Sequence, residues 1–305
     1  MRSVEFSTLL HRALESRLAR LLELTILPDW PQEPESVHQV RVASRRVRAV
    51  LDLADPERYG GFKRSVKRLH QLTEALGLTR ELDVHVGILE GLGPHLSGPG
   101  PWAALEHVLE RVDSRRRKAR KVMMKELGKL ELEDLRRLLE MKTEGDPQVP
   151  GDLKQEIWDC LAPTVEPALA TLRDLSAADE SLALHAERVR IKKLRYTLEI
   201  LGAAFPDYPD KRLARLKALQ TVLGNHHDHA TLEARVQEIL TPLEIRSRPV
   251  LANGVAQILD LVTCERARLF GRFRELTAEF PAEDFADGLR AELGVDLPAE
   301  AGPAS

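Results

Sequence analysis

The sequence predicts an all-α protein built as a tandem duplication of two helical halves. Apolar residues recur at the helical period in almost every segment, and no long alternating run indicates a strand. Leu, Ala, Arg and Glu dominate the 305 residues, and aromatic residues make up only 4%. This composition favours helices that pack through aliphatic side chains. In addition, two separate motifs recur at the same offset along the chain.

Twelve helices are expected wherever apolar residues recur every three to four positions between helix-breaking segments. In the first half they cover 3–26, 35–54, 60–77, 80–92, 101–128 and 131–142. In the second half they cover 152–175, 180–204, 208–224, 227–242, 250–279 and 283–293. The breaks coincide with segments rich in proline and glycine: LPDWPQEP, GLGPHLSGPGP, TEGDPQVPG and AAFPDYPD.

The segment TEGDPQVPG falls close to the middle of the chain and divides it into two parts of similar length. We therefore predict a single domain over 1–305, made of a first helical half, 3–142, and a second helical half, 152–293. Residues 143–151 are the predicted linker, and residues 294–305 are expected to form a disordered tail.

The duplication is visible in two pairs of segments. VHQVRVASRRVRAVL aligns with LHAERVRIKKLRYTL, and LHQLTEALGLTREL aligns with LKALQTVLGNHHDH. His38 and His185 are 147 residues apart, and so are Gly77 and Gly224. Two motifs that share one offset indicate a tandem duplication in which each half is a helical bundle.

The first repeated segment places its basic residues on one face of a helix. At 100° per residue, with His38 at zero, Arg45 lies at about −20°, Arg41 at about −60° and Arg48 at about −80°. Arg46 lies on a flank. The opposite side is apolar and carries Val40, Ala43, Val47, Val50 and Leu51. The second segment repeats the stripe with His185, Arg188, Lys192 and Arg195, backed by Leu194 and Leu198.

A basic stripe is most often a solvated helix face, and this alternative has to be weighed. Solvated faces usually mix both signs, often as Glu–Lys pairs four residues apart. The first stripe contains no acid, and like charges at this spacing repel unless an anion neutralises them. Because the second half repeats the pattern, we interpret the stripes as a binding site.

The spacing also indicates the kind of ligand. Four cations over ten residues line a track about 15 Å long, at a rise of 1.5 Å per residue. Arginine donates forked hydrogen bonds to phosphate oxygens, lysine supplies a point charge, and histidine adds a donor whose charge depends on pH. Two such tracks facing each other would hold a long, linear, highly charged anion.

These motifs resemble those of the CHAD family, whose name stands for conserved histidine α-helical domain. The resemblance covers about residues 3–280 and rests on HxxRVxxRRVR at 38–48, HxxRVRxKKLR at 185–195, LGxxRExDV at 76–84 and LQxxLGxxHD at 219–228. It implies two four-helix bundles related by pseudo-twofold symmetry, with a basic central cavity or pore that binds inorganic polyphosphate. The family is associated with polyphosphate granules and is not known for catalysis. The chain has no ExExK motif of a triphosphate-tunnel domain and therefore resembles the stand-alone form.

Carried over by position, the resemblance implies the residues that line the polyphosphate site: His38, Arg41, Arg45, Arg46, Arg48, His185, Arg188, Lys192, Lys193 and Arg195. Lys217 matches the lysine that usually precedes the LG turn. Its counterpart is His70, a departure that weakens this contact in the first half.

The family's RD and ND pairs read Arg80–Glu81 and His227–Asp228 here. We interpret Glu81 and Asp228 as carboxylates in the first turn of a helix, where they serve structure or position arginines and do not bind ligand.

Two further features need an interpretation. HHDH at 226–229 suggests a metal site, but adjacent helical residues point about 100° apart, so four in a row cannot converge on one ion. We interpret it as the start of a surface helix and expect no metal. The basic run RVDSRRRKARKVMMKE contains Arg117 and Lys121, and Arg266 lies in the matching late helix. For these three residues a solvated face and a cavity wall are equally good interpretations.

Composition narrows the class of protein. Hydrophobic residues make up 43% and charged residues 30%, as in soluble globular proteins, and no apolar run is long enough to span a membrane. The N-terminal segment carries acids and lacks the apolar centre of a secretory signal. Cys160 and Cys264 have no ligand spacing and are expected to be buried free thiols in a reducing compartment. We expect a cytoplasmic protein, with polyphosphate granules as the place that the resemblance implies.

The sequence therefore predicts non-covalent binding of inorganic polyphosphate, with no cofactor and no catalytic residue. One alternative is a metal-dependent polyphosphate hydrolase that uses the HHDH stretch. The other is a protein that binds nucleic-acid phosphates without reading sequence. The low aromatic content and the formal net charge of −3 argue against nucleic acid.

Overall fold

The computed structural model of the chain is mainly helical over the residues that it describes, with no strand among them. These residues are 3–26, 30–54, 63–129, 132–137, 152–175, 181–205, 207–242, 245, 247–280 and 282–295. The first half contains α1 (Val4–Ile26), α2 (Pro34–Leu53), α3 (Lys63–Gly91), α4 (Pro99–Leu127) and the short α5 (Leu132–Arg137). The second half contains α6 (Leu153–Leu175), α7 (Ser181–Leu201), α8 (Asp210–Leu240), α10 (Pro249–Ala278) and α11 (Ala282–Leu293). Single 3₁₀ turns, η2 (Gly93–His95) and η4 (Gly202–Ala204), follow α3 and α7. The all-α prediction is confirmed.

Several helices begin where the sequence favours a helix start. Pro34, Pro99 and Pro249 each occupy the first turn of a long helix. Proline is favourable there because its fixed φ suits the helix and its missing N–H has no partner to lose. Gly98, directly before α4, has a φ of 91°, which an L side chain rarely adopts. The chain can therefore reverse sharply between α3 and α4.

The predicted helix breaks after Gly77 and Gly224 are wrong, because α3 and α8 run through these positions. A glycine inside a helix costs about 1 kcal/mol relative to alanine, but it does not end a helix that tertiary packing supports. Leucines before and after Gly77, such as Leu76 and Leu82, are buried and continue the packing.

Two interpretations made from the sequence fail for the same reason. The HHDH stretch lies in the interior of α8 and does not start a surface helix; His226 is only 2% exposed. Glu81 and Asp228 also lie in helix interiors, far from the first turns of α3 and α8. The charges of these residues therefore act on neighbouring helices, and not on a helix terminus.

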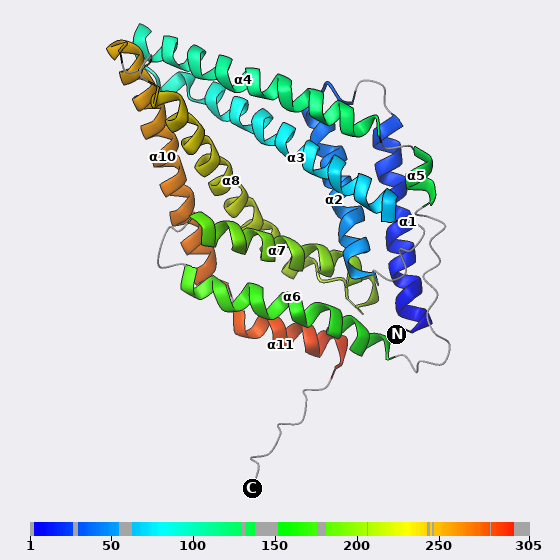
Figure 1. The fold of residues 1–305 in the computed structure, drawn as a ribbon. Helices are drawn as coiled ribbons and strands as arrows, with labels where there is room; N and C mark the ends of the chain where they lie inside the picture. The colour runs from blue at the N-terminus through cyan, green and yellow to red at the C-terminus, as the bar shows by residue number, and fades with distance from the viewer. Residues whose placement is uncertain are drawn as a thin grey trace.

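Figure 1 shows how the helices are arranged. The α3–α4 pair and the α8–α10 pair converge at the upper left, while α6, α7 and α11 form the lower edge. Across the molecule, α4 packs along α10, and α2 contacts α7. The two halves of the chain therefore meet at two separate places.

The apolar residues form two cores, and each core draws on both halves of the chain. The larger core includes residues of α1, α2, α6 and α7 and the beginnings of α3 and α8. The second core lies where the two long hairpins meet, and it contains Leu82, Leu89, Val108, Val112, Leu232, Val236, Val255, Ile258 and Val262. Packing therefore ties the halves into one unit.

Some predictions fall on residues that the structure does not describe. The linker, 143–151, lies outside the described residues, as do the end of the helix expected over 131–142 and residues 296–305 of the expected tail. The prediction that both cysteines are buried is wrong for Cys264, which is exposed on α10, whereas Cys160 is half-buried. In the part of the chain that is described, no helix combines the length and apolar character needed to cross a membrane.

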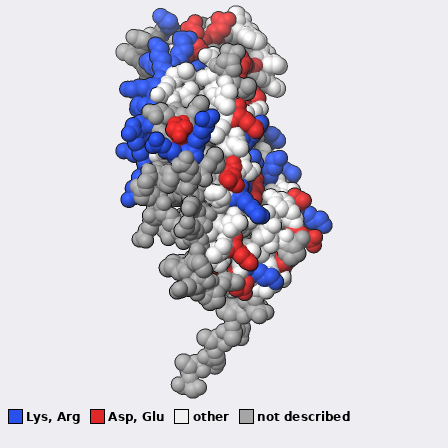
Figure 2. Space-filling view, turned by 90° about the vertical axis from the view of Figure 1, so that its right-hand side faces the viewer, with Lys and Arg blue, Asp and Glu red and all other residues white. Residues whose placement is uncertain are grey.

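Figure 2 views the molecule from the right-hand side of Figure 1. Lys and Arg gather along one edge of its upper part, and Asp and Glu are scattered over the rest of the face. The low net charge of −3 therefore hides an uneven distribution, with basic surface concentrated in particular places.

Candidate functional site

The two basic stripes lie on helices whose apolar faces are buried as predicted. On α2 these buried residues are Val40, Ala43, Val47, Val50 and Leu51. On α7, Leu194 and Leu198 are fully buried. Burial of one face leaves the basic face of each helix pointing away from the core, and α2 and α7 contact each other.

Basic side chains of both halves gather at this contact. Burial, followed by the charges of Arg45, Arg188 and Arg41, lowers the pKa of Lys192 to about 7. Burial, and then the positive charges of Arg45 and Arg188, lower the pKa of Arg41 to about 10. Because residues of α2 and α7 disfavour each other's charge, the two stripes face each other within electrostatic reach.

A cavity of about 400 Å³ opens between α2, α3 and α7. Five cations line it: Arg41, Arg45, Arg48, Lys192 and Lys193. Two acids, Asp52 and Glu74, line it as well, so positive charge is in excess. Among the described residues, none of the five cations forms an ion pair or a side-chain hydrogen bond, and the buried Nε atoms of Arg41 and Arg48 have no partner. The cavity therefore concentrates positive charge that contacts with the described residues do not neutralise.

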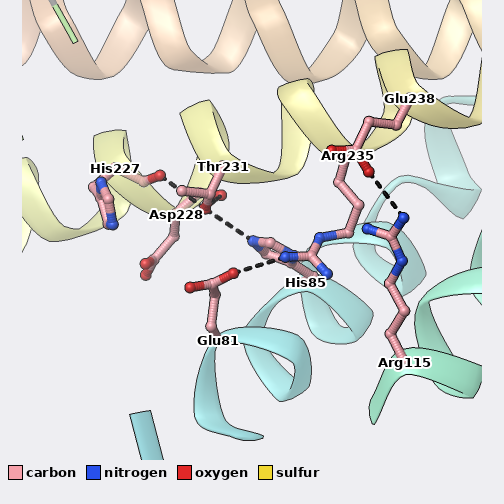
Figure 3. A network of polar contacts seen from close by, with 8 residues as sticks. All are labelled: Glu81, His85, Arg115, His227, Asp228, Thr231, Arg235 and Glu238. Atoms are coloured by element: carbon pink, nitrogen blue, oxygen red, sulfur yellow. Dashed lines mark hydrogen bonds and ion pairs between the residues drawn. The ribbon is translucent and has the colours of Figure 1, made fainter. Parts of the chain in front are cut away.

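One further carboxylate lies near the stripes. Burial raises the pKa of Asp228 on α8, and the charges of Arg188 and Arg41 oppose that rise. Asp228 therefore lies within electrostatic reach of one arginine from each half. Figure 3 shows its carboxylate on the side of α8 that faces Glu81 of α3.

A polar network joins α3 to α8 next to Asp228 (Figure 3). Glu81 accepts a hydrogen bond from Arg235 Nη2 at 2.8 Å. His85 Nε2 lies 3.1 Å from Thr231 Oγ1, and burial lowers the pKa of His85 to about 3. His85 is therefore neutral at physiological pH, and the network serves to hold the two long helices together.

Equivalent arginines of the two halves occupy equivalent places. A Cβ added at Gly77 would lie 3.8 Å from Arg41 Nε, and one added at Gly224 would lie 3.9 Å from Arg188 Nε. Each arginine thus lies beside the glycine of the long helix that follows it.

The two histidines of the stripes each have a neighbour on the following long helix. His185 Nδ1 lies 3.1 Å from Nδ1 of His227, three residues after Gly224. In the first half, burial and then the charge of Arg80, three residues after Gly77, lower the pKa of His38. Neither His38 nor His185 lines the 400 Å³ cavity. Each lies beside a residue of the following long helix.

A carboxylate holds two of the residues predicted to line the site. Glu199 of α7 forms ion pairs with Arg46, at 3.6 Å to Nε, and with Arg195. Arg195 Nε also donates a hydrogen bond to Gln220 at 2.7 Å. Arg46 and His38 border a second hollow, of about 800 Å³, that lies between α1, α2 and the start of α8.

The other predicted residues lie outside the cavity lining. His70 is half-buried, and burial and then the charge of Arg48 lower its pKa, which places it beside the cavity. Lys217 is exposed on α8.

The residues for which the sequence left two interpretations open also lie outside the lining of the 400 Å³ cavity. Arg117 forms an ion pair with Asp113, and Arg266 forms one with Glu233 at 2.9 Å. Lys121 is exposed on α4. Arg117 also borders a separate hollow between α3 and α4, and Arg266 is mostly shielded from solvent, so for these three residues both interpretations stay open.

Sequence reasoning missed the uncharged part of the cavity lining. Thr73, Tyr196 and Thr197 all line it. Tyr196 and Thr197 directly follow the second stripe, but they align with the apolar Ala49 and Val50 of the first half. Ala49 lines the cavity as well and Val50 is buried, so the alignment gave no signal that a cavity opens there.

The HHDH stretch does not form a metal site with other residues that the structure describes. His226 is buried, and its ring centroid lies 6.4 Å from that of Phe270, while His227 faces His185. Across the described ranges, no group of three or more His, Cys, Asp or Glu side chains is arranged to hold a metal ion.

The family model of the CHAD domain matches residues 12–237 of the chain. Two curated relatives from strains of Mycobacterium tuberculosis, the uncharacterized proteins Rv2226 and MT2285, are each 28% identical over 236 residues. The match covers 72% of this chain and 43% of each relative, so the chain spans less than half the length of these relatives.

Two solved structures share the fold. The CHAD domain from the plant Ricinus communis has a TM-score of 0.57 and 20% identity, covering 97% of this chain and 93% of that chain. PptA from Streptomyces chartreusis has a TM-score of 0.61 and 16% identity, covering 90% of this chain and 98% of that chain. At these identities the likeness concerns the fold alone.

Proposed function

Because this chain belongs to the CHAD domain family, we propose that it binds inorganic polyphosphate non-covalently in the cavity between α2, α3 and α7. The observation that carries the proposal is the excess of cations around this cavity. Five basic residues from both halves line it against two acids, and none of the five is neutralised by an ion pair among the described residues.

Polyphosphate suits this arrangement because it is a linear polymer with a negative charge on every unit. Arginine binds phosphate oxygens through paired N–H groups, and lysine adds a compact charge. The like charges of Arg41, Arg45, Arg188 and Lys192 disfavour one another in the free protein, so an anion that neutralises them is strongly favoured. By analogy with nucleic acids, release of counterions from the polymer makes binding weaken steeply with salt.

The proposal is for binding without turnover, with polyphosphate granules as the place where the protein acts. Retention of the protein on granules, followed by fluorescence imaging, tests this part. A protein that stays diffuse in cells containing granules contradicts it.

Binding is tested by replacing Arg41, Arg45, Arg188 and Lys192 together with Ala. We expect long-chain polyphosphate binding to be lost while the helical circular dichroism spectrum is kept, because all four side chains lie away from the cores. A matched control replaces four exposed cations outside the cavity: Lys63, Arg64, Lys118 and Lys125. The control should bind within about twofold of the unchanged protein at moderate salt. Unchanged binding by the first variant contradicts the proposal.

Two measurements distinguish the proposal from its alternatives. A competition titration of polyphosphate against RNA at fixed salt shows whether the protein binds polyphosphate more tightly than RNA. Phosphate release from polyphosphate with Mg²⁺ or Mn²⁺ present, compared with a variant that lacks His226 and His227, shows whether the protein is a hydrolase.

A further inference from the structure

The two openings beside α2 differ in their balance of charge. Arg45 lines the 400 Å³ cavity, and the next residue, Arg46, borders the 800 Å³ hollow. Five cations and two acids line the cavity. The larger hollow carries three arginines, Arg17, Arg20 and Arg46, and also three acids, Glu35, Glu199 and Asp210. The larger opening is therefore close to neutral, although it has more room.

Glu199 neutralises Arg46 at the border of the larger hollow. Its side chain is only 17% exposed and pairs with both Arg46 and Arg195. Arg195 lies within electrostatic reach of Arg45, so this carboxylate touches the edge of the basic cluster. The backbone carbonyl of Glu199 also accepts a hydrogen bond from Arg17 at 3.4 Å.

The first half of the chain has no equivalent of this arrangement. Asp52, which lies 147 residues before Glu199, occupies the equivalent place near the end of α2. Asp52 is exposed, lines the 400 Å³ cavity and forms no ion pair with any described residue. The cations around it, including Lys193, which is the counterpart of Arg46, therefore stay available. The two ends of the basic cluster are thus chemically unequal.

We propose that Glu199 is a specificity residue that closes one end of the basic cluster, so that a bound polyphosphate chain stops at the α2–α7 contact. The inference rests on the proposed function and adds a direction and a length limit to it. Because Glu199 pairs with Arg46 and Arg195, a polyphosphate chain that continued into the larger hollow would gain no binding energy there. The bound segment is the part of the polymer that fits the smaller cavity.

Chain length provides the test. Replacing Glu199 with Gln removes the charge and keeps the shape, so Arg46, which borders the larger hollow, becomes free to contact phosphate, while Arg195 keeps its hydrogen bond to Gln220. Long-chain polyphosphate can then extend past the contact, whereas tripolyphosphate, which is short, stays in the cavity. The control is Asp52→Asn, which removes the same charge at the equivalent place but frees no arginine.

Calorimetric titrations of the full chain with both ligands, over a series of salt concentrations, give the result. We expect Glu199→Gln to raise the affinity for long-chain polyphosphate about tenfold and that for tripolyphosphate less than about twofold. Its salt dependence for the long chain should steepen by about 0.7 for each added phosphate contact. Asp52→Asn should raise both affinities by similar, small factors.

The outcomes separate two failures. If Glu199→Gln changes the affinities for both ligands equally, or changes neither, Glu199 does not limit chain length, although the binding proposal stands. If the unchanged protein fails to bind long-chain polyphosphate, the proposed function fails and the role of Glu199 with it. A circular dichroism spectrum and an unfolding midpoint for each variant show that the fold is kept.

Discussion

Lys192 carries a charge that the folded protein disfavours. Its pKa falls to about 7 in the fold, from an ordinary value of 10.5, through burial and then the nearby arginines. At pH values between 7 and 10.5, the Lys192 side chain is protonated in the unfolded chain and neutral in the folded chain. The cost of burying the charge therefore lowers the free energy of unfolding in full below pH 7, and this cost disappears as pH rises toward 10.5.

Replacing Lys192 with Met should stabilise the free protein, because it removes the disfavoured charge and keeps the length of the side chain. We expect a gain of about 2 kcal/mol in the free energy of unfolding at pH 6 and little gain at pH 10. Urea unfolding at the two pH values measures it. The exposed neighbour Lys193, replaced with Met, is the control and should change stability by less than about 0.5 kcal/mol. A gain that is larger at pH 10 contradicts the argument.

Glu187 is an acid in a place that the first half fills with an apolar residue. It is fully buried on α7 and aligns with the buried Val40. Burial raises its pKa to about 7, and the ion pair with Arg190, at 3.3 Å, offsets this only in part. Between pH 4.5 and 7 the folded state binds more protons than the unfolded state, so stability falls as pH rises through this window.

Glu187→Gln should therefore stabilise the protein at pH 8, where the carboxylate is charged, by about 1 kcal/mol. At pH 4 the carboxyl is protonated in the fold, and the variant should be neutral or slightly less stable. Thermal unfolding at both pH values gives the comparison. Destabilisation at pH 8 would mean that the pair with Arg190 outweighs the burial of the charge.

At the scale of elements, α8 is joined to α3 and α4 by two ion pairs in different surroundings. The side chains of Arg235 and Glu81 are 14% and 30% exposed, whereas those of Arg115 and Glu238 are 47% and 60% exposed. Solvent screens the second pair strongly, and removal of Glu81 leaves the guanidinium of Arg235 poorly solvated. The ion pair of Arg235 with Glu81 therefore contributes more to the free energy of unfolding than the ion pair of Arg115 with Glu238.

We expect Glu81→Ala to lower the free energy of unfolding by about 1–2 kcal/mol and Arg115→Ala by less than about 0.5 kcal/mol. Chemical denaturation of the two variants tests the difference, since each variant removes one ion pair of α8. Equal losses would contradict the role assigned to burial. Raising the salt concentration should reduce the already small effect of Arg115→Ala further.

At the scale of the molecule, the sequence predicted what depends on short spacing. Helix periodicity was enough to assign the buried and basic faces of α2 and α7, because residues three and four apart share a face. The same reasoning missed that α3 and α8 continue through glycines, because their continuity depends on long-range packing. The helical wheel placed Arg46 on a flank and the family resemblance added it to the site, but neither contains information about Glu199 on another helix. The alternatives for Arg117 and Arg266 were open for the same reason.

The shared cores predict how the two halves depend on each other. Val108 and Val112 of α4 pack in one cluster with Val255 and Ile258 of α10, so each half alone exposes an apolar face. We expect residues 1–147 and 148–305, produced separately, to be helical but to bind a hydrophobic dye and to unfold without a sharp transition. Mixed in equal amounts, the two fragments should associate and recover the cooperative unfolding of the full chain, because the contacts of α4 with α10 and of α2 with α7 re-form. Cooperative unfolding of either fragment alone, without dye binding, would show that each half is an independent bundle and that the shared core adds little stability.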